Sequence, residues 1–191
     1  MKVDIDLGTS NTVLAYRDKE NIKILKSNHD SYLMPSRVLL LEDDSIIVGW
    51  DALTHPKRFP NKSINISAIK RQLGKTEKLN FSSFSTYPQE ISALVLSELK
   101  CQFESLTNQQ LEEVVIAIPS HFDENQRSAT IDSAKIAGLK VARLLNEATV
   151  AAIAYSSDHQ IVGKILVFDL GGGTLDLSVI DVHYKLLRSE L

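Results

Sequence analysis

Two stretches of the chain share one pattern, VDIDLGTSNTVLAY at 3–16 and ILVFDLGGGTLDLSVIDV at 165–182. In each, an apolar strand ends in Asp-Leu-Gly, small hydroxylated residues form a turn, and a second apolar strand follows. Alternating apolar residues on both sides of a glycine turn predict a β-hairpin. Two such hairpins near opposite ends of the sequence indicate a duplicated architecture, in which each half offers one hairpin to a shared ligand.

The two turns suit a phosphate group. Glycine has no Cβ, so at Gly8 and at Gly171–Gly173 an anion can approach the backbone closely and the chain can adopt a positive φ. Asp6 and Asp169 would repel that anion unless a divalent cation lies between them, and Mg²⁺ prefers hard oxygen ligands with retained water. The pair of turns therefore predicts phosphate together with magnesium.

A simple hairpin loop is the alternative explanation for each turn. For DLGTSN at 6–11 both explanations stay open on this motif alone. DLGGGTLD at 169–176 favours phosphate, because three consecutive glycines cost conformational entropy in a hairpin that two residues could close. Strands follow both turns and neither turn carries Gly-Lys-Ser/Thr, so neither the P-loop nor the dinucleotide-binding fingerprint fits them.

The composition limits the class of protein. A length of 191 residues with 43% hydrophobic content predicts one domain, or one domain with a subdomain. A net charge of -3 and short basic runs argue against nucleic acid as a partner. No apolar run approaches the roughly 20 residues that cross a bilayer, so no membrane partner is expected.

The cellular compartment is expected to be the cytoplasm. The first strand begins by residue 3, which leaves no room for an export signal ahead of it. Cys101 is the single cysteine, so an internal disulfide cannot form. Base rates of thiol burial predict that Cys101 packs in the core.

Periodicity predicts the order of the elements. Residues 3–7, 12–16 and 22–25 indicate an antiparallel meander. From 35 to 87 the pattern changes to short mixed pieces, with a short helix at 67–74. Pro88 then opens a long helical pattern. It is followed by strand 113–119, helix 123–138 capped by Asp123 and Gly138, strand 140–146, helix 147–157 and the closing hairpin, which predicts an α/β sheet.

At this point the residues resemble the actin-like ATPase superfamily and, within it, the 70-kDa heat-shock chaperones of DnaK type. The likeness rests on IDLGTSN (5–11), AIKRQLG (68–74), VVIAIPSHFDENQRSAT (114–130), AGLKVARLLNEATVAAIAY (137–155) and VFDLGGGTLD (167–176), in the family's order and near its spacing. The short stretch between Gly74 and Pro88 is most similar to HscC-type members.

The resemblance implies a fold and its division. The fold would be an actin-like ATPase (ribonuclease H-like) lobe I, with a mixed β-sheet flanked by helices, plus the first hairpin of lobe II. Residues 1–34 and 88–160 would form the lobe I core, 35–87 an inserted smaller subdomain, and 161–191 the incomplete opening hairpin of lobe II.

The resemblance also implies a site for ATP or ADP with Mg²⁺. Asp6 and Asp169 would hold the metal through water. The phosphates would be wrapped by Gly8, Thr9, Ser10 and Asn11 on one side and by Gly171, Gly172, Gly173 and Thr174 on the other. Lys70 matches the lysine whose charge lies at the γ-phosphate. Taken alone, a lysine on a short surface helix predicts a solvated side chain.

Carboxylates complete the implied catalytic set of Lys70, Glu147, Thr174 and Asp176. Glu147 matches the family's glutamate near the attacking water, and Asp176 matches a further carboxylate of the same site. Positioning and electrostatics are most of what phosphoryl transfer requires. Without the family, Glu147 would be a helix N-terminal charge that favours the helix dipole.

Four more residues match coupling or partner positions. With Glu147, Pro119 and Arg127 match a relay that couples nucleotide state to an attached peptide-binding domain. Arg143 and Asn146 match positions that face the interdomain linker or a J-domain co-chaperone. From the residues alone, Pro119 can simply end a strand and Arg127 can be a solvated helix residue.

Three positions depart from the family pattern. Ala148 replaces the proline after the glutamate, Leu175 replaces a phenylalanine, and Ser10 replaces the usual threonine but keeps its hydroxyl. Ala148 removes a fixed φ from the first helical turn, so Glu147 is expected to be held less firmly. The coupling is affected by this change more than nucleotide binding.

The implied function is that of a chaperone ATPase whose hydrolysis drives binding and release of unfolded peptides, with a J-domain co-chaperone and a nucleotide-exchange factor as further partners. A small-molecule (sugar) kinase and an actin-like filament protein are the alternatives; a kinase would need a further carboxylate base at a substrate hydroxyl. This chain alone is expected to hydrolyse ATP poorly and to dimerise through its unpaired hairpin edge.

Overall fold

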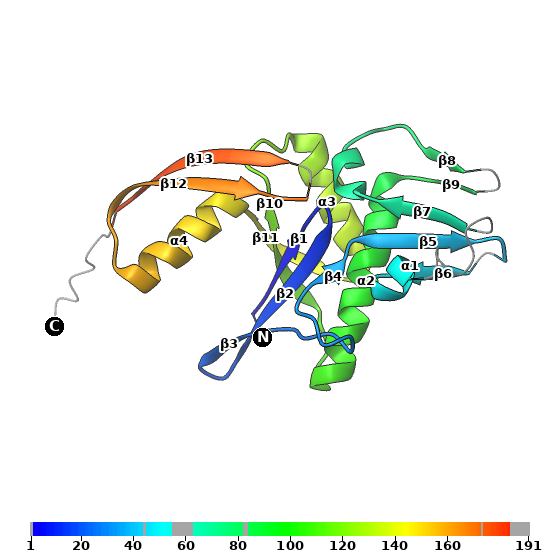
Figure 1. The fold of residues 1–191 in the computed structure, drawn as a ribbon, viewed down its shortest axis with the longest axis horizontal. Coiled ribbons are helices and arrows are strands. Elements are labelled where there is room, and N and C mark those ends of the chain that lie inside the picture. Colours follow the sequence, from blue (N-terminus) through cyan, green and yellow to red (C-terminus); the bar gives the residue numbers. More distant parts are fainter. Residues whose placement is uncertain (1, 44, 55–62, 82–83, 173, 184–191) are drawn as a thin grey trace.

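The computed structural model describes residues 2–43, 45–54, 63–81, 84–172 and 174–183 (Figure 1). Gly173 and the end of the predicted 161–191 segment lie outside the described residues. Within these ranges, six strands form one mixed sheet in the order β11-β10-β1-β2-β3, with β4 paired to β2. Its strands are β1 Val3–Leu7, β2 Asn11–Asp18, β3 Asn21–Ile24, β4 Met34–Pro35, β10 Glu113–Ile118 and β11 Lys140–Asn146.

The directions of the strands decide where the functional residues gather. Strands β1, β2 and β3 form the predicted antiparallel meander. Strands β1, β10 and β11 run parallel, so their carboxyl ends meet at one edge of the sheet. The observed mixed sheet with flanking helices fits an actin-like ATPase fold in general.

One face of the sheet carries the core. The helices α2 (Pro88–Thr107) and α3 (Glu124–Ile136) lie on one side of the sheet, and α4 (Glu147–His159) lies on the other with the closing hairpin (Figure 1). Val3, Ile5 and Leu7 are buried, whereas the aspartates between them face the other side. This alternation is the period-two pattern expected of a strand with one core face. It places Asp6 on the side of the hairpin.

Hydrogen bonds cap the starts of the two long core helices, and a glycine follows the end of α3. In α2, Glu90 accepts a hydrogen bond from the Tyr87 backbone N–H at 2.7 Å. In α3, the Asp123 carboxylate accepts from the Gln126 backbone N–H at 2.8 Å. Gly138 follows α3 with a φ of +67°, a conformation that glycine adopts without strain. The predicted caps of the 123–138 helix are therefore confirmed.

The expectation for Cys101 was wrong, because its thiol side chain is exposed. The buried stripe of α2 runs through Ile91, Val95, Leu99 and Phe103. A residue two positions after Leu99 lies about 200° around the helix from it, on the outer face. Helical periodicity, rather than the burial statistics of cysteine, decides this position.

The segment between β4 and α2 builds small separate sheets. Strands β5 (Arg37–Leu41), β6 (Ile46–Val48) and β7 (Ser63–Ser67) pair in the order β6-β5-β7, and β8 (Leu79–Phe81) pairs with β9 (Phe84–Thr86). A short helix α1 (Trp50–Thr54) and a 3₁₀ turn (Ile69–Gln72) complete this part of the described chain. The helix predicted around Lys70 is thus a single 3₁₀ turn.

The closing hairpin pairs β12 (Gly163–Leu170) with β13 (Leu175–Val182) in one antiparallel ladder. One face of the ladder packs on α4, as Figure 1 also shows. The other face is exposed, with Leu166, Phe168 and Leu177 each about 60% exposed or more. In the described part of the chain, this hairpin pairs with no third strand. Nor does any helix described there have the length and apolarity that would carry it across a membrane.

Candidate functional site

The first glycine turn is tightly closed, and Ser36 holds it through hydrogen bonds. A Cβ on Gly8 would collide with the backbone carbonyl oxygen of Asn11, so the turn needs glycine at this point. Ser36 Oγ donates to the Gly8 carbonyl at 2.8 Å, and the Ser36 N–H donates to the Ser10 carbonyl at 2.9 Å. The Thr12 hydroxyl lies 2.9 Å from Ser36 Oγ. Buried hydrogen bonds therefore fix the path of this turn.

Ser36 was not among the predicted site residues. It is 3% exposed and directly follows β4, which pairs with the start of β2. A serine after a proline carries no chemical signature in the sequence. Only the pairing of β4 with β2 brings it beneath the turn.

The second glycine turn meets the first. A Cβ on Gly172 would collide with the Ser10 side-chain oxygen, so the two turns touch at this point. Within the second turn, the Gly171 N–H donates to the Thr174 carbonyl at 2.9 Å. Turns from near opposite ends of the sequence are thus in direct contact, at Ser10 and Gly172.

The two turns line a common cavity of about 200 Å³. It lies at the edge where β1, β10 and β11 end. Its lining combines backbone-rich turns, one lysine and three carboxylates: Asp6, Gly8, Thr9, Ser10, Asn11, Lys70, Glu147, Asp169, Gly171, Gly172 and Thr174. Of the twelve predicted nucleotide, metal and catalytic positions that lie among the described residues, eleven line this cavity, and Asp176 is the exception.

Lys70 is buried in this site and is not solvated. Its side chain is 9% exposed, and its Nζ donates to Glu147 Oε1 at 2.6 Å. The Phe122 ring centroid lies 5.9 Å from the same Nζ, within the range of a cation–π contact. A buried ammonium group needs such partners, because an unpaired charge would cost several kcal/mol. The prediction from the short helix alone was therefore wrong.

The carboxylates of the site influence one another. Loss of surrounding water raises the pKa of Glu147, which Lys70 lowers in part and which the charges of Asp6 and Asp169 raise further. Asp6 keeps accessible surface inside the cavity, yet the surrounding protein likewise raises its pKa, against the attraction of Lys70 and with the repulsion of Asp169. Asp6 and Glu147 are therefore both attracted to Lys70 and both repelled by Asp169, and a further cation would relieve this repulsion.

The donor set fits magnesium held through water. Among the residues that the structure describes, no three His, Cys, Asp or Glu side chains come close enough to bind one metal ion directly. Asp6 and Asp169 come from different hairpins and both line the cavity. Mg²⁺ usually keeps several waters and binds one or two carboxylates plus phosphate oxygens. These residues suit that arrangement better than a dehydrated metal cage.

Asp176 lies beside the cavity and not among its lining residues. It is the ladder partner of Asp169, and its Oδ1 lies 3.2 Å from His121 Nδ1. His121 was not predicted as a site residue, although it lies within the quoted stretch 114–130. A histidine in a loop after a strand has no defined partner until the hairpin is placed.

The four predicted coupling residues lie outside the cavity lining. Pro119 is buried directly after β10. Arg127 Nε donates to the Phe122 carbonyl at 3.1 Å, which links it indirectly to the ring beside Lys70. Arg143 is exposed on β11, and Asn146 precedes α4 without capping it through its side chain. Their predicted roles in coupling stay predictions.

A second cavity of about 420 Å³ adjoins the site on the side of α4. It shares Asp6, Glu147 and Asp169 with the first cavity, and its other lining residues are apolar or small. Ala148 lines this space and is 8% exposed. Ala148, which stands where the resembled family has a proline, therefore lies next to Glu147 in the wall of this second cavity.

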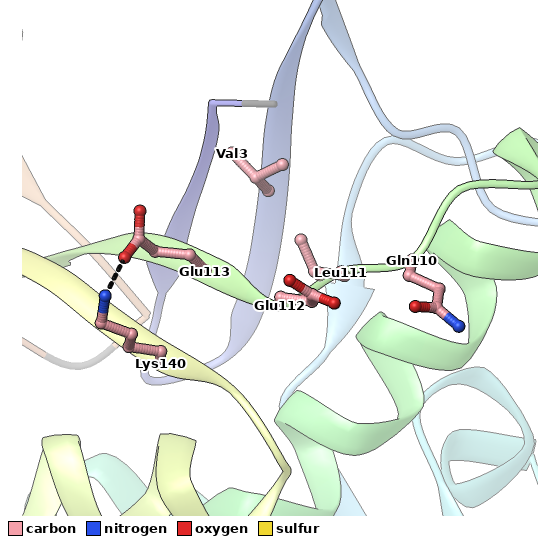
Figure 2. Close-up of a pocket in the computed structure, with 6 residues that line it drawn as sticks. All are labelled: Val3, Gln110, Leu111, Glu112, Glu113 and Lys140. Atoms are coloured by element: carbon pink, nitrogen blue, oxygen red, sulfur yellow. Dashed lines mark ion pairs between the residues drawn. The ribbon is translucent and has the colours of Figure 1, made fainter.

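A pocket of about 350 Å³ occupies the opposite edge of the sheet (Figure 2). Glu113 and Lys140 pair there at 2.7 Å, at the starts of β10 and β11. In open α/β sheets, ligands bind at the carboxyl ends of the strands. The pocket of Figure 2 contains none of the predicted site residues, and the cavity between the turns is the better candidate site.

A family model for Hsp70 protein matches residues 78–187, which is more than half of the chain. The chain belongs to the Hsp70 family. Members of the Hsp70 family are chaperones that bind nucleotide and are ATPases. The Hsp70 match includes Glu147 and the second glycine turn, whereas Lys70 and the first turn precede it. Lys70 and the first turn are therefore assigned to the site by their geometry alone.

Proposed function

We propose that this chain forms a Mg·ATP-binding part of an Hsp70 nucleotide-binding domain, equivalent to lobe I with the first hairpin of lobe II. The observation that carries the proposal is the contact between the two glycine turns at Ser10 and Gly172. Lys70 and Glu147 line the same cavity. A phosphate chain needs this combination of close backbone N–H groups, a cation and carboxylates for metal-bound water.

The proposed roles follow from these positions. The N–H groups of the two turns would donate to phosphate oxygens, with the hydroxyls of Thr9, Ser10 and Thr174 beside them. Mg²⁺, when bound, would neutralise and orient the phosphate oxygens. Asp6 and Asp169 would accept hydrogen bonds from its waters. Glu147 would hold the attacking water, with Asp176 as a further carboxylate near the turn.

Lys70 connects the phosphate site to α4. Its Nζ donates to Glu147, the first residue of that helix, and both side chains line the cavity. A terminal phosphate in the cavity would compete with Glu147 for the lysine charge, because both are anions within reach of one cation. Nucleotide state would thereby alter the start of α4 and the Phe122–Arg127 contact. Pro119 would take part in the same relay.

The wider assignment is also proposed. Unfolded peptides would be the clients of a complete protein, and a J-domain co-chaperone and a nucleotide-exchange factor its regulators. Arg143 and Asn146 would face the J-domain or the interdomain linker. The division into 1–34 with 88–160, 35–87 and 161–191, the cytoplasmic location and the HscC-type likeness stay predictions.

Isothermal titration calorimetry with ATP, in the presence of Mg²⁺ and then of excess EDTA, tests nucleotide binding. We expect binding that requires Mg²⁺ and that Gly172→Ala weakens more than tenfold, since its Cβ would push Ser10 out of the cavity. Gly171→Ala should cost less, because its Cβ would make only ordinary contacts of 3.6 Å with Thr174. Equal losses in both variants would contradict the proposed meeting of the turns.

Turnover assays separate the alternative functions. For this chain alone we expect slow ATP hydrolysis. Stimulation of ATP turnover by unfolded peptide in a complete protein would support the chaperone, whereas turnover that requires a sugar hydroxyl would support the kinase. ATP-dependent light scattering by polymers would support a filament protein.

A further inference from the structure

Two carboxylates lie opposite each other beside the second glycine turn. Asp169 and Asp176 are direct ladder partners of β12 and β13, so their side chains leave the same face of the hairpin. Like charges directly opposite on an antiparallel pair are destabilising. The hairpin therefore carries a local repulsion at the end that forms the cavity.

His121 supplies a partner for one of these two charges. Its Nδ1 lies 3.2 Å from Asp176 Oδ1, and the two side chains are 55% and 29% exposed. The histidine belongs to the loop between β10 and α3, and the aspartate belongs to the hairpin. The contact therefore joins the edge of the main sheet to the hairpin.

The loop that carries His121 is held in place independently of the hairpin. The Phe122 N–H donates to the Pro119 carbonyl at 3.2 Å, which closes a turn around His121. Arg127 Nε donates to the Phe122 carbonyl, and Asp123 caps α3 directly after the loop. The imidazole also packs edge-on against the Phe122 ring, with centroids 5.8 Å apart.

Neighbouring residues of this loop contact two different elements beside the cavity. The Phe122 ring lies 5.9 Å from Lys70 Nζ on the side of the 3₁₀ turn. His121 reaches Asp176 on the side of the hairpin. One loop therefore contacts both the lysine and the strand that follows the second glycine turn.

We propose that His121 is a positioning residue: when protonated, its imidazole draws Asp176 away from Asp169 and holds the second glycine turn against the first. Asp169 is then left free for the cavity, where the proposed function assigns it to metal-bound water. The first half of this inference concerns the hairpin alone. Only the second half rests on the proposed function.

Three variants separate charge from packing. His121→Phe keeps a ring against Phe122 and removes the charge, whereas His121→Lys keeps a charge and removes the ring. His183→Phe is the matched control, because His183 Nε2 also lies 3.2 Å from an aspartate of β13, Asp181, at the other end of the hairpin. Both replaced side chains, His121 and His183, are more than half exposed, so the three variants are expected to fold.

The first measurement is hydrogen exchange of the nucleotide-free chain at about pH 6. An ordinary imidazole is largely charged at this pH. His121→Phe should exchange about two- to five-fold faster across residues 165–180, the size expected for one half-exposed ion pair. His121→Lys should match the unsubstituted chain, and His183→Phe should leave the residues near the turn unchanged. Exchange in His121→Lys as fast as in His121→Phe would overturn the proposal, as would no change in His121→Phe.

Titration with Mg·ATP is the second measurement. His121→Phe should weaken binding by about two- to five-fold, with recovery in His121→Lys. If the unsubstituted chain fails to bind Mg·ATP, the proposed function is wrong while the exchange result still decides the role of His121. If binding occurs and His121→Phe leaves both measurements unchanged, His121 does not position the turn.

Discussion

The two glycine hairpins have the same local sequence pattern and opposite surroundings. Around the first turn, Val3, Ile5 and Leu7 are at most 3% exposed, and β10 pairs along the other side of β1. Around the second, Leu166 and Leu177 are 66% and 59% exposed, and the described ladder has two strands. The turn residues make a similar cradle in both, but only the first cradle belongs to a packed sheet. The first hairpin is therefore expected to be the fixed wall of the cavity and the second the adjustable one.

The largest difference should appear when each turn glycine is replaced by alanine. At Gly8 the added Cβ would collide with backbone, which cannot give way, and we expect a loss of about 3 kcal/mol in the free energy of unfolding. At Gly172 it would collide with the Ser10 side chain on an exposed hairpin, so the loss should stay below about 1 kcal/mol. Urea denaturation of both variants measures the difference. Equal losses would mean that the second hairpin is held as firmly as the first.

The cradle itself could be read from the sequence, because its causes are local. Strand alternation, the glycine turns, and the caps of 123–138 depend on residues within a few positions of one another. The burial of Lys70 could not be read in this way, since its partner Glu147 is 77 residues away. Ser36 and His121 also have ordinary local sequences and acquire their partners only through strand pairing and hairpin placement. For Lys70, the family resemblance supplied what local pattern could not.

Removal of the Ser36 hydroxyl, which holds the first turn, should have the next largest effect on stability. Ser36→Ala removes the hydroxyl that donates to the Gly8 carbonyl and leaves the buried Thr12 hydroxyl with one partner fewer. We expect a loss of about 1–2 kcal/mol in the free energy of unfolding. Ser45→Ala is the matched control, because Ser45 also donates to a neighbour but is exposed. Chemical denaturation should show little change in the free energy of unfolding of Ser45→Ala. An equally small change in Ser36→Ala would show that the Ser36 hydrogen bonds are not needed to hold the first turn.

A smaller effect on stability should come from the charge of Asp169 in the second hairpin, which acts on Asp6 in the first and on Glu147. Asp169 raises the pKa of Asp6 and Glu147, which loss of water already raises above the ordinary carboxyl range. A raised folded pKa favours the protonated form, so the stability cost is absent below the ordinary pKa of about 4 and grows as pH increases through the folded value. Asp169→Asn should lower both pKa values and flatten this decline.

Thermal unfolding measures this decline between about pH 4 and pH 8, in the unsubstituted chain and in the Asp169→Asn variant. The difference in stability between the two chains is compared at each pH, because contributions from carboxylates elsewhere then cancel. Direct titration of the Asp6 and Glu147 carboxyl groups by NMR would locate the effect. Parallel pH curves would mean that the hairpins are too far apart to share charge. This outcome would weaken the case for one metal between Asp6 and Asp169.

The exposed face of the second hairpin should contribute least to the stability of the chain. Leu166 and Val179 are ladder partners, each 66% exposed, so replacing both by threonine should change the free energy of unfolding by less than about 0.5 kcal/mol. The same pair should matter more for association, because an unpaired apolar ladder favours contact with another chain. Analytical ultracentrifugation should therefore detect less dimer in the double variant at equal concentration. Unchanged association would exclude this face as the dimer contact, whereas a large loss of stability would show that the second hairpin is packed like the first.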